Sequence, residues 1–201
     1  RSVPLAQRDA RARAMLERVG LGAAFADRHP SSLSGGQLQR VGIARALIGD
    51  ARLIICDEPV SALDVSIQAQ VLNLLHEMQR SLGLSYVFIS HDLSVVANMA
   101  DDIAVMYLGK VMEYGPASTV LGKPAHPYTQ ALVDSANIPD PRIEKSRRTI
   151  ALKGEIPTPT QPPSGCCFRT RCRLAAAVCA EQEPALAARG AVQHAVACHF
   201  A

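Results

Sequence analysis

Residues 53–64 read LIICDEPVSALD, a short apolar run that ends abruptly in Asp57 and Glu58. Continuous apolar runs of this length between polar flanks are typical of parallel strands that are buried on both faces. Residues 85–89 repeat the pattern just before His91, and residues 65–81 between the two runs place their apolar side chains on one helical face. A strand, a helix and a second strand in this order predict an α/β domain with a mainly parallel sheet.

The flanking segments continue this alternation. Apolar residues at helical spacing predict helices over residues 5–19, 36–48 and 92–99. Residues 103–114 predict a hairpin around Gly109-Lys110. The sequence therefore predicts regular structure along its first 120 residues or so.

The composition changes near residue 123. Prolines become frequent there, and five of the six cysteines follow residue 165. We therefore expect a domain over residues 1–122 and a Cys- and Pro-rich C-terminal extension with little regular structure over residues 123–201.

Length and composition restrict the class of protein. The chain has 201 residues, of which 48% are hydrophobic, enough for one packed domain and a small appendage. No apolar run approaches the roughly 18 residues of a membrane-spanning helix, so a membrane role would need a partner. The chain opens on Arg1-Ser2-Val3-Pro4, without an initiator Met, and we expect it to be the C-terminal portion of a longer protein.

Positive charge gathers toward the C-terminus. Residues 141–201 contain 9 Lys and Arg against 4 Asp and Glu, within a net charge of +3 for the chain. A basic tail suits nucleic acid or anionic headgroups, and it is also the ordinary form of a solvated surface. Since aromatic residues make up 4% of the chain and no stacking platform interleaves these charges, we expect no nucleic-acid partner.

The helix predicted over residues 36–48 begins with an anion-binding pattern. The run Leu33-Ser34-Gly35-Gly36-Gln37 places two glycines where free N–H groups point along the positive end of the helix dipole. With the Ser34 hydroxyl and the Gln37 amide, this helix start suits a γ-phosphate. Taken alone, the motif is more simply a Ser34 helix cap with glycines in a turn.

Acidic and imidazole side chains follow the two predicted strands. Asp57 and Glu58 are neighbours in an extended chain, so one carboxylate can face Mg²⁺ while the other reaches an attacking water. We expect Glu58 to be the general base, with its pKa raised by its neighbours and by exclusion of water. His91 can hydrogen-bond the phosphate or the water. The alternatives are a capping Asp-Glu pair before Pro59 and a structural histidine.

The ordered set of these segments resembles the ATPase subunit of ABC transporters. It comprises the Leu33–Gln37 helix start, Asp57-Glu58-Pro59, Ser61-Ala62-Leu63-Asp64 and His91. Residues 60–70, His126-Pro127-Tyr128-Thr129 and Pro162-Pro163-Ser164-Gly165-Cys166 resemble, more narrowly, the ATP-binding subunits of bacterial oligopeptide and dipeptide importers.

This resemblance implies a motor that couples ATP hydrolysis to peptide transport, with ATP and Mg²⁺ as its ligands. Glu58 and His91 would be catalytic, Asp57 would hold Mg²⁺, and the remaining nucleotide-binding residues would be Ser34, Gly35, Gly36, Gln37 and Asp64. Asp64 would belong to a loop that crosses to a second ATPase subunit. The other implied partners are membrane permeases and, indirectly, a peptide-binding protein, with the motor peripheral on the cytoplasmic face of the membrane.

The sequence contains no G-x-x-x-x-G-K-[ST] motif, which would cradle the β- and γ-phosphates. We therefore expect the chain alone to have no ATPase activity. Two other classes stay open: a non-transport ABC ATPase that acts on nucleic acid, and a truncated, non-catalytic module for metal binding or docking.

The cysteines of the extension form a possible metal site. Cys166, Cys172, Cys179 and Cys198 are spaced C-x5-C-x6-C-x18-C, and four thiolates suit Zn²⁺ or a [4Fe–4S] cluster. The resemblance to peptide importers favours iron–sulfur. The alternative is a set of reduced cysteines in a small apolar core with Phe168, Leu174 and Val178.

Overall fold

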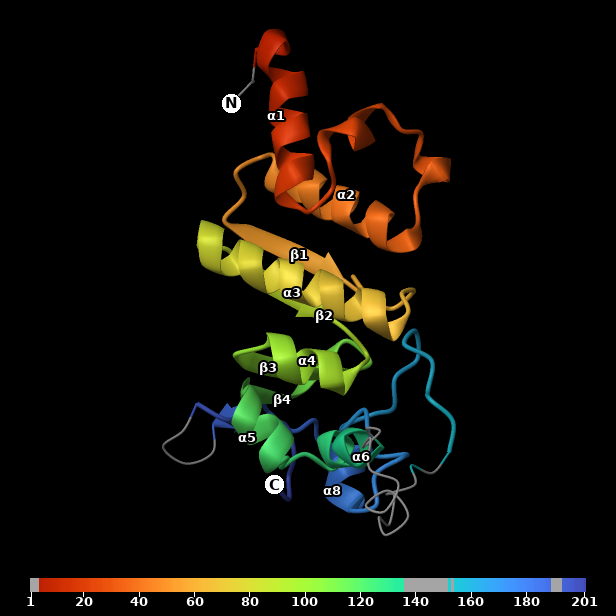
Figure 1. Ribbon diagram of the computed structural model, residues 1–201. Helices are drawn as coiled ribbons and strands as arrows, with labels where there is room; N and C mark the ends of the chain where they lie inside the picture. Colours follow the sequence, from red (N-terminus) through yellow and green to blue (C-terminus); the bar gives the residue numbers. More distant parts are fainter. Residues whose placement is uncertain (1–3, 136–151, 153, 189–192) are drawn as a thin grey trace, which may run out of the picture. The chain divides into compact units, whose positions relative to one another are not determined.

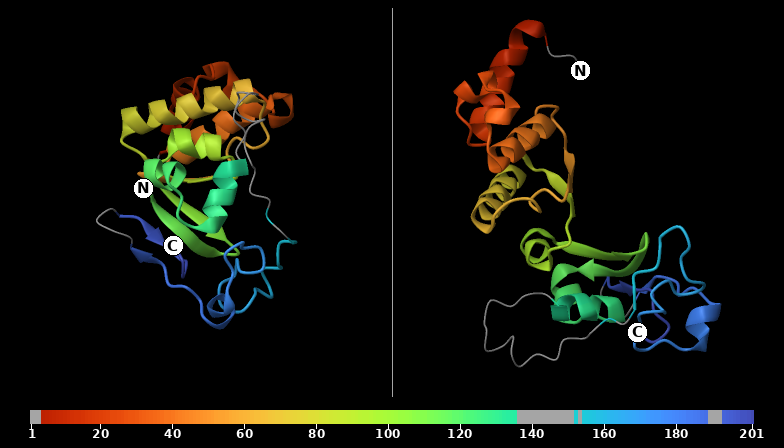
Figure 2. Two further views of the ribbon diagram at one scale, coloured as in Figure 1. Left: turned by 90° about the horizontal axis from the view of Figure 1, so that it is seen from below. Right: turned by 90° about the vertical axis from the view of Figure 1, so that its right-hand side faces the viewer.

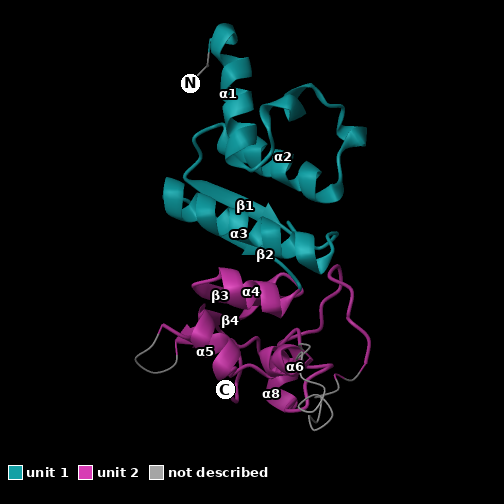
Figure 3. Ribbon diagram, viewed as in Figure 1, with its two compact units in different colours: residues 1–91 teal, residues 92–201 magenta. Residues whose placement is uncertain are grey.

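The computed structural model describes residues 4–135, 152, 154–188 and 193–201. The chain divides into two compact units, Arg1–His91 and Asp92–Ala201 (Figure 3). The boundary expected near residue 122 falls inside the second unit.

The first unit follows the predicted alternation of helices and strands (Figure 1). Its elements are α1 (Leu5–Arg18), the 3₁₀ turns η1 (Ala23–Asp27) and η2 (Pro30–Ser32), α2 (Gly35–Leu47), β1 (Leu53–Asp57), α3 (Val65–Leu82) and β2 (Ser85–Ile89). β1 and β2 pair in parallel, with Ile55 opposite Val87 and Asp57 opposite Ile89. The predicted α/β order and parallel pairing are confirmed.

One face of this two-stranded sheet is open. Leu53, Ile55, Val87 and Ile89 lie on it with 46–67% of their surface exposed. The opposite face carries Cys56, which is buried, and Ile54, Tyr86 and Phe88, which are half-buried. The prediction that both strands are buried on both faces is therefore wrong for the described part of the chain, because only one face is covered.

The starts of α2 and α3 approach each other very closely. A Cβ atom on Gly36 would lie 2.5 Å from Cγ2 of Ile67, and one on Gly35 would lie 3.4 Å from Cδ2 of Leu63. Arg40 of α2 adds two further contacts, to the Val19 carbonyl at 2.9 Å and to Oε1 of Gln70 on α3 at 3.3 Å. Glycine at position 36 therefore fixes how near the two helices can lie.

The second unit is built around an antiparallel sheet in the order β3-β4-β6-β5. Its elements are α4 (Leu93–Met99), β3 (Asp102–Tyr107), β4 (Lys110–Pro116), α5 (Ala117–Gly122), α6 (Pro127–Ser135), α8 (Ala177–Glu181), β5 (Ala187–Ala188) and β6 (Ala195–Val196). Helices α5 and α6 pack against the β3–β4 hairpin, as the right-hand view of Figure 2 shows. Over its described residues the C-terminal extension is mostly irregular, as its composition predicted, but α6 and α8 are helical and β5 and β6 join the sheet.

The hairpin turn lies one residue earlier than the sequence suggested. Leu108 and Gly109 both have positive φ angles, 48° and 77°, and Tyr107 pairs with Lys110. Two consecutive left-handed residues are the signature of a type I′ turn, whose twist matches that of the strands. The turn residues are therefore Leu108-Gly109, and Lys110 begins β4.

A buried carboxylate ties the C-terminal extension to the hairpin. Glu113 of β4 is fully buried and accepts hydrogen bonds from the backbone N–H groups of Ala125 and His126, both at 2.9 Å. Its Oε1 also lies 2.7 Å from Nε2 of the buried His194. Hydrogen bonds of this kind compensate the cost of burying the carboxylate.

No helix among the described residues is long and apolar enough to cross a bilayer.

Candidate functional site

The carboxyl ends of β1 and β2 bring Glu58 and His91 together. Nδ1 of His91 lies 3.0 Å from Oε1 of Glu58, and both side chains are exposed. Parallel strands end at the same sheet edge, and so two residues far apart in sequence meet where α/β domains usually bind ligands. Sequence reasoning placed both residues at this edge, and the structure joins them.

The backbone of Glu58 has an unusual conformation. Its φ angle is +44°, in the left-handed region that non-glycine residues rarely occupy. Its N–H donates to the Ile89 carbonyl at 3.0 Å, and its own carbonyl accepts from the Ser61 hydroxyl at 3.2 Å. These bonds hold a strained residue in place, and such strain is commonly found where a side chain must be aimed. Nothing in the sequence signalled this strain.

The expected rise in the pKa of Glu58 is wrong for this structure. Hydrogen bonding of the carboxylate to the side chains of His91 and, to a lesser degree, Ser61 lowers the pKa of Glu58 from its ordinary 4.5, because it favours the charged form. The expected desolvation is small here, since the side chain of Glu58 is 47% exposed. Glu58 is therefore an ionised carboxylate that can accept a proton, paired with an imidazole.

Ser34 and Gln37 form a reciprocal cap at the start of α2. The Gln37 N–H donates to Oγ of Ser34 at 3.4 Å, and the Ser34 N–H donates to Oε1 of Gln37 at 3.0 Å. This is a capping box, so the simpler interpretation of the motif as a helix cap is present in the structure. Gly35 is exposed, and the backbone of this helix start stays accessible to an anion.

Asp64 caps α3 beside the start of α2. Its Oδ1 accepts from the Ile67 N–H at 2.9 Å and from the Ser66 hydroxyl at 2.7 Å, and these bonds lower the pKa of Asp64. Through the Gly36–Ile67 and Gly35–Leu63 contacts, the segment that holds Asp64 packs directly on the helix start at Ser34. The structure thus joins the predicted site residues into two groups. One is Glu58 with His91, and the other is Ser34 to Gln37 with the Asp64 loop.

Asp57 ends β1 on the exposed side of the sheet edge. A carboxylate in that place, open to water, fits a hydrated Mg²⁺, which keeps most of its waters and needs few protein ligands. Asp57 is the residue of this edge that could hold the ion.

The described cysteines do not form a metal centre. Within residues 4–135, 152, 154–188 and 193–201, no group of three or more His, Cys, Asp or Glu side chains is arranged to hold a metal ion. Cys166, Cys167 and Cys179 are instead buried with Tyr107, Met112 and Phe168, and Cys172 packs against them. Burial raises the pKa of Cys166 to about 11, which favours the protonated thiol. The predicted iron–sulfur or zinc centre is not supported. The alternative core is present in part, since Phe168 and Val178 pack with these cysteines whereas Leu174 is 46% exposed.

Two family models match separate parts of the chain. The model described as "ABC transporter" matches residues 2–61, and the model described as "Oligopeptide/dipeptide transporter, C-terminal region" matches residues 112–179. The first match contains Ser34 to Gln37 and Glu58, and the second contains Cys166, Cys172 and Cys179 of the predicted metal ligands but not Cys198.

Curated proteins resemble almost the whole chain. The oligopeptide transport ATP-binding protein OppF of Salmonella typhimurium is 54% identical over 188 residues, which are 94% of this chain and 56% of that protein. AppF of Bacillus subtilis, also named an oligopeptide transport ATP-binding protein, is 52% identical over 96% of this chain and 59% of its own length. The dipeptide transport ATP-binding protein DppF of Escherichia coli is 50% identical over 90% of this chain and 53% of its own length. The chain thus spans a little more than half the length of these relatives.

Solved structures share the fold of part of the chain. An inward-facing putative metal-chelate type ABC transporter matches 60% of this chain and 47% of its own, with a TM-score of 0.55 and 32% identity. An ATP-binding cassette of an ABC transporter in its ADP conformation matches 62% of this chain and 50% of its own, with a TM-score of 0.54 and 29% identity.

Proposed function

Because the chain belongs to the ATP-binding proteins of oligopeptide and dipeptide ABC transporters, we propose that it works in an ATP-driven peptide importer. Its part there is to supply the Ser34–Gln37 helix start and the Glu58–His91 pair to the ATPase motor. The observation that carries this proposal is the 3.0 Å contact between Glu58 and His91 at the carboxyl ends of two parallel strands. The partners are a second ATPase subunit and membrane permeases, with the motor peripheral on the cytoplasmic face.

The chemistry proposed for the Glu58–His91 pair is activation of water. The ionised Glu58 accepts a proton from the water that attacks the γ-phosphate of ATP, and His91 fixes the direction in which the carboxylate points. Mg²⁺ on Asp57 would neutralise charge that develops on the phosphate oxygens. The left-handed backbone of Glu58 and its contact with His91 would together fix the direction of the carboxylate.

The role proposed for the start of α2 is to contact phosphate bound by a partner. Its exposed Gly35 and free N–H groups suit the γ-phosphate, and opening of the capping box would free the Ser34 hydroxyl and the Gln37 amide to join them. The sequence has no phosphate-cradling G-x-x-x-x-G-K-[ST] loop, so we propose that the chain by itself does not hydrolyse ATP.

The transport role can be tested with a chimera in which this chain replaces the matching segment of the Salmonella typhimurium relative. We expect the chimera to restore oligopeptide uptake in cells that lack that relative. Glu58→Gln should abolish uptake, and Glu77→Gln, which changes an exposed carboxylate on α3, should not. A well-expressed chimera that restores no uptake would contradict the transport role.

A metal in the cysteine region stays a prediction of the sequence. What favours it is that backbone N–H groups point at two of the sulfur atoms, from Leu174 to Cys172 at 3.4 Å and from Phe200 to Cys198 at 3.5 Å. The bond from Leu174 lowers the pKa of Cys172, although burial has the larger effect and raises that pKa overall. Iron, acid-labile sulfide and zinc measured on anaerobically purified protein test it. Near-stoichiometric metal that is lost in Cys172→Ser would support a metal centre. Trace amounts of metal would contradict the prediction.

A further inference from the structure

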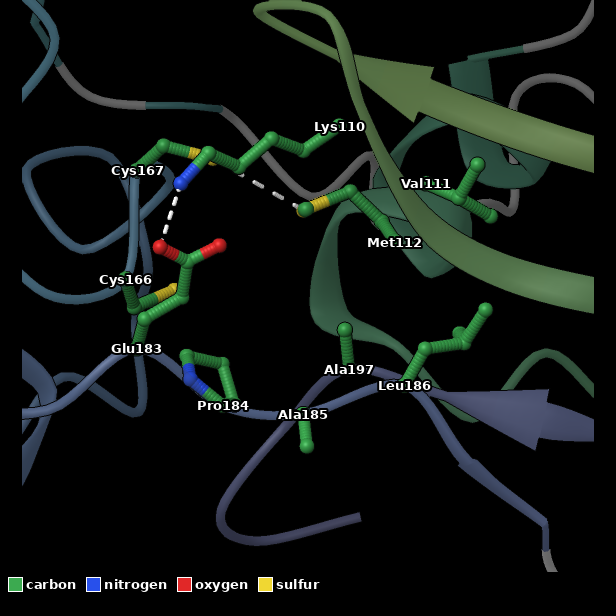
Figure 4. Close-up of a pocket in the computed structure, with 10 residues that line it drawn as sticks. All are labelled: Lys110, Val111, Met112, Cys166, Cys167, Glu183, Pro184, Ala185, Leu186 and Ala197. Atoms are coloured by element: carbon green, nitrogen blue, oxygen red, sulfur yellow. Dashed lines mark hydrogen bonds and ion pairs between the residues drawn. The ribbon is translucent and has the colours of Figure 1, made fainter.

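A cavity in the second unit has no part in the nucleotide chemistry. It has a volume of about 520 Å³, which lies within the range of small-molecule sites. It lies between the first residues of β4 and the chain that runs from α8 to β5 (Figure 4). Its apolar wall consists of Val111, Met112, Pro184, Ala185, Leu186 and Ala197.

Two opposite charges lie together at this cavity. Nζ of Lys110 is 2.5 Å from Oε2 of Glu183, and the two side chains are 40% and 56% exposed. Figure 4 shows this pair beside the two cysteines of the lining, with the apolar side chains around the rest of the opening. Lys110 and Glu183 are the charged residues of the lining, so the site has no net charge.

We propose that this cavity binds a small zwitterion, a free amino acid or a short peptide with an apolar side chain. The ligand's carboxylate would pair with Lys110 and its ammonium with Glu183, while its side chain would lie against the apolar wall. Binding replaces the Lys110–Glu183 ion pair by two ion pairs with the ligand, so each protein charge keeps a partner of opposite sign. An exposed ion pair adds little to stability, so a ligand can separate it readily.

Other ligand classes fit this cavity less well. An anion would pair with Lys110 but would bring negative charge beside Glu183, and a cation would do the reverse. A neutral apolar molecule would use the wall alone and leave the polar pair unengaged. The zwitterion satisfies both charges and the wall together, and this complementarity decides the class.

The test compares three ligands that share one side chain and differ in the charge of their backbone groups. Calorimetric titration of the full 201-residue chain with L-leucine, N-acetyl-L-leucine and L-leucinamide, without nucleotide, presents a zwitterion, an anion and a cation with one side chain. We expect L-leucine to bind at one site, at least tenfold more tightly than either singly charged analogue. Equal affinity for all three, or no binding of L-leucine or L-alanyl-L-leucine at millimolar concentration, would overturn the proposal.

Titration with a dipeptide and with variants of the chain completes the test. Tighter binding of L-alanyl-L-leucine than of L-leucine would assign the site to short peptides, and the reverse order would assign it to free amino acids. Lys110→Met and Glu183→Gln should each weaken binding of the tighter ligand at least tenfold with an unchanged melting temperature. Lys123→Met, at an exposed lysine outside the cavity, should leave it unchanged. Unaltered binding in both cavity variants would also overturn the proposal.

The site is independent of the proposed ATPase role. The titration needs no ATP, no Mg²⁺ and no partner subunit. A failure of the ATPase role would leave the binding result standing, and a failure of binding would leave the ATPase role standing. If both hold, an imported product would bind to the motor itself, which would give a route for feedback on import.

Discussion

Glu58 is aimed by its backbone and held by its neighbour. Its φ angle is positive, and Oε1 of its carboxylate lies 3.0 Å from Nδ1 of His91. A left-handed non-glycine residue costs free energy, so the two backbone hydrogen bonds at Glu58 must offset that cost. Glu58 is therefore an ionised carboxylate with a defined direction.

The effect of His91 on Glu58 can be measured by NMR titration of the Glu58 carboxyl carbon. We expect its pKa to lie below 4.5 in the natural chain and to rise in His91→Ala, since the His91 contact is the largest cause of the lowered value. A group with a lowered pKa stabilises the fold above its unfolded pKa, and that contribution is lost as the pH falls through the folded pKa. An identical pKa in His91→Ala would contradict the pairing.

His126 predicts a pH dependence of stability. Burial lowers the pKa of His126 to about 4 from 6.5, and its Nδ1 accepts the Tyr128 N–H at 3.0 Å. The unfolded chain therefore takes up a proton first, and stability falls as the pH drops from 6.5 toward 4, by up to about 3 kcal/mol. Urea unfolding between pH 7 and 4.5 should show this loss, and it should be smaller in His126→Asn, whose amide oxygen can replace the acceptor. An unchanged slope in the variant would contradict it.

Of the described glycines of the first unit, Gly36 in α2 comes closest to a side chain of another element, that of Ile67 in α3. The Cβ position of Gly36 lies 2.5 Å from Ile67, while that of Gly35 lies 3.4 Å from Leu63. The two helices carry the Ser34 and Asp64 caps at their starts. Their spacing therefore sets the distance between two of the proposed nucleotide-contacting groups.

Gly36→Ala should destabilise the first unit by about 1–3 kcal/mol, because the added methyl group overlaps a packed side chain. Ile67→Ala removes that side chain's Cγ2, so the double variant should lose less than the sum of the single losses. Chemical denaturation measures all three. Gly35→Ala is the control, since its neighbour lies at an ordinary contact distance and the loss should be smaller. Strict additivity of the Gly36 and Ile67 variants would show that the contact is absent.

The open face of β1 and β2 should make the isolated chain prone to self-association. Ile55 is 67% exposed on that face, whereas its neighbour Ile54 is half-buried on the other. Exposed apolar strands favour association. Light scattering should show less association in Ile55→Lys with little change in melting temperature, and a clear loss of stability in Ile54→Lys. Equal effects of the two variants would contradict the assignment of the faces.

At the scale of the whole molecule, the order of elements and the meeting of Glu58 with His91 could be predicted from sequence. Two apolar runs joined by an amphipathic helix are a local pattern, and the geometry of parallel strands then places their following residues at one edge. The open sheet face could not be predicted, since burial of a strand depends on which layers cover it.

The contact between Glu113 and His194 also could not be predicted from the sequence. These residues are 81 positions apart, and neither belongs to a motif, yet their contact joins β4 to the C-terminal extension. The direction of the Glu58 pKa shift was missed for a related reason. It depends on two hydrogen bonds and on exposure, which the order of residues does not reveal.

Phosphate release by the chimera with the Salmonella typhimurium relative tests whether Glu58 is the general base of the motor. Glu58→Gln should lower the rate at least about 100-fold, because a general base contributes on that scale, and Glu77→Gln should leave it unchanged. The chain alone should release no phosphate above the buffer blank. The claim is contradicted if Glu58→Gln keeps the full rate in the chimera, or if the chain alone turns over ATP in a way that Glu58→Gln abolishes.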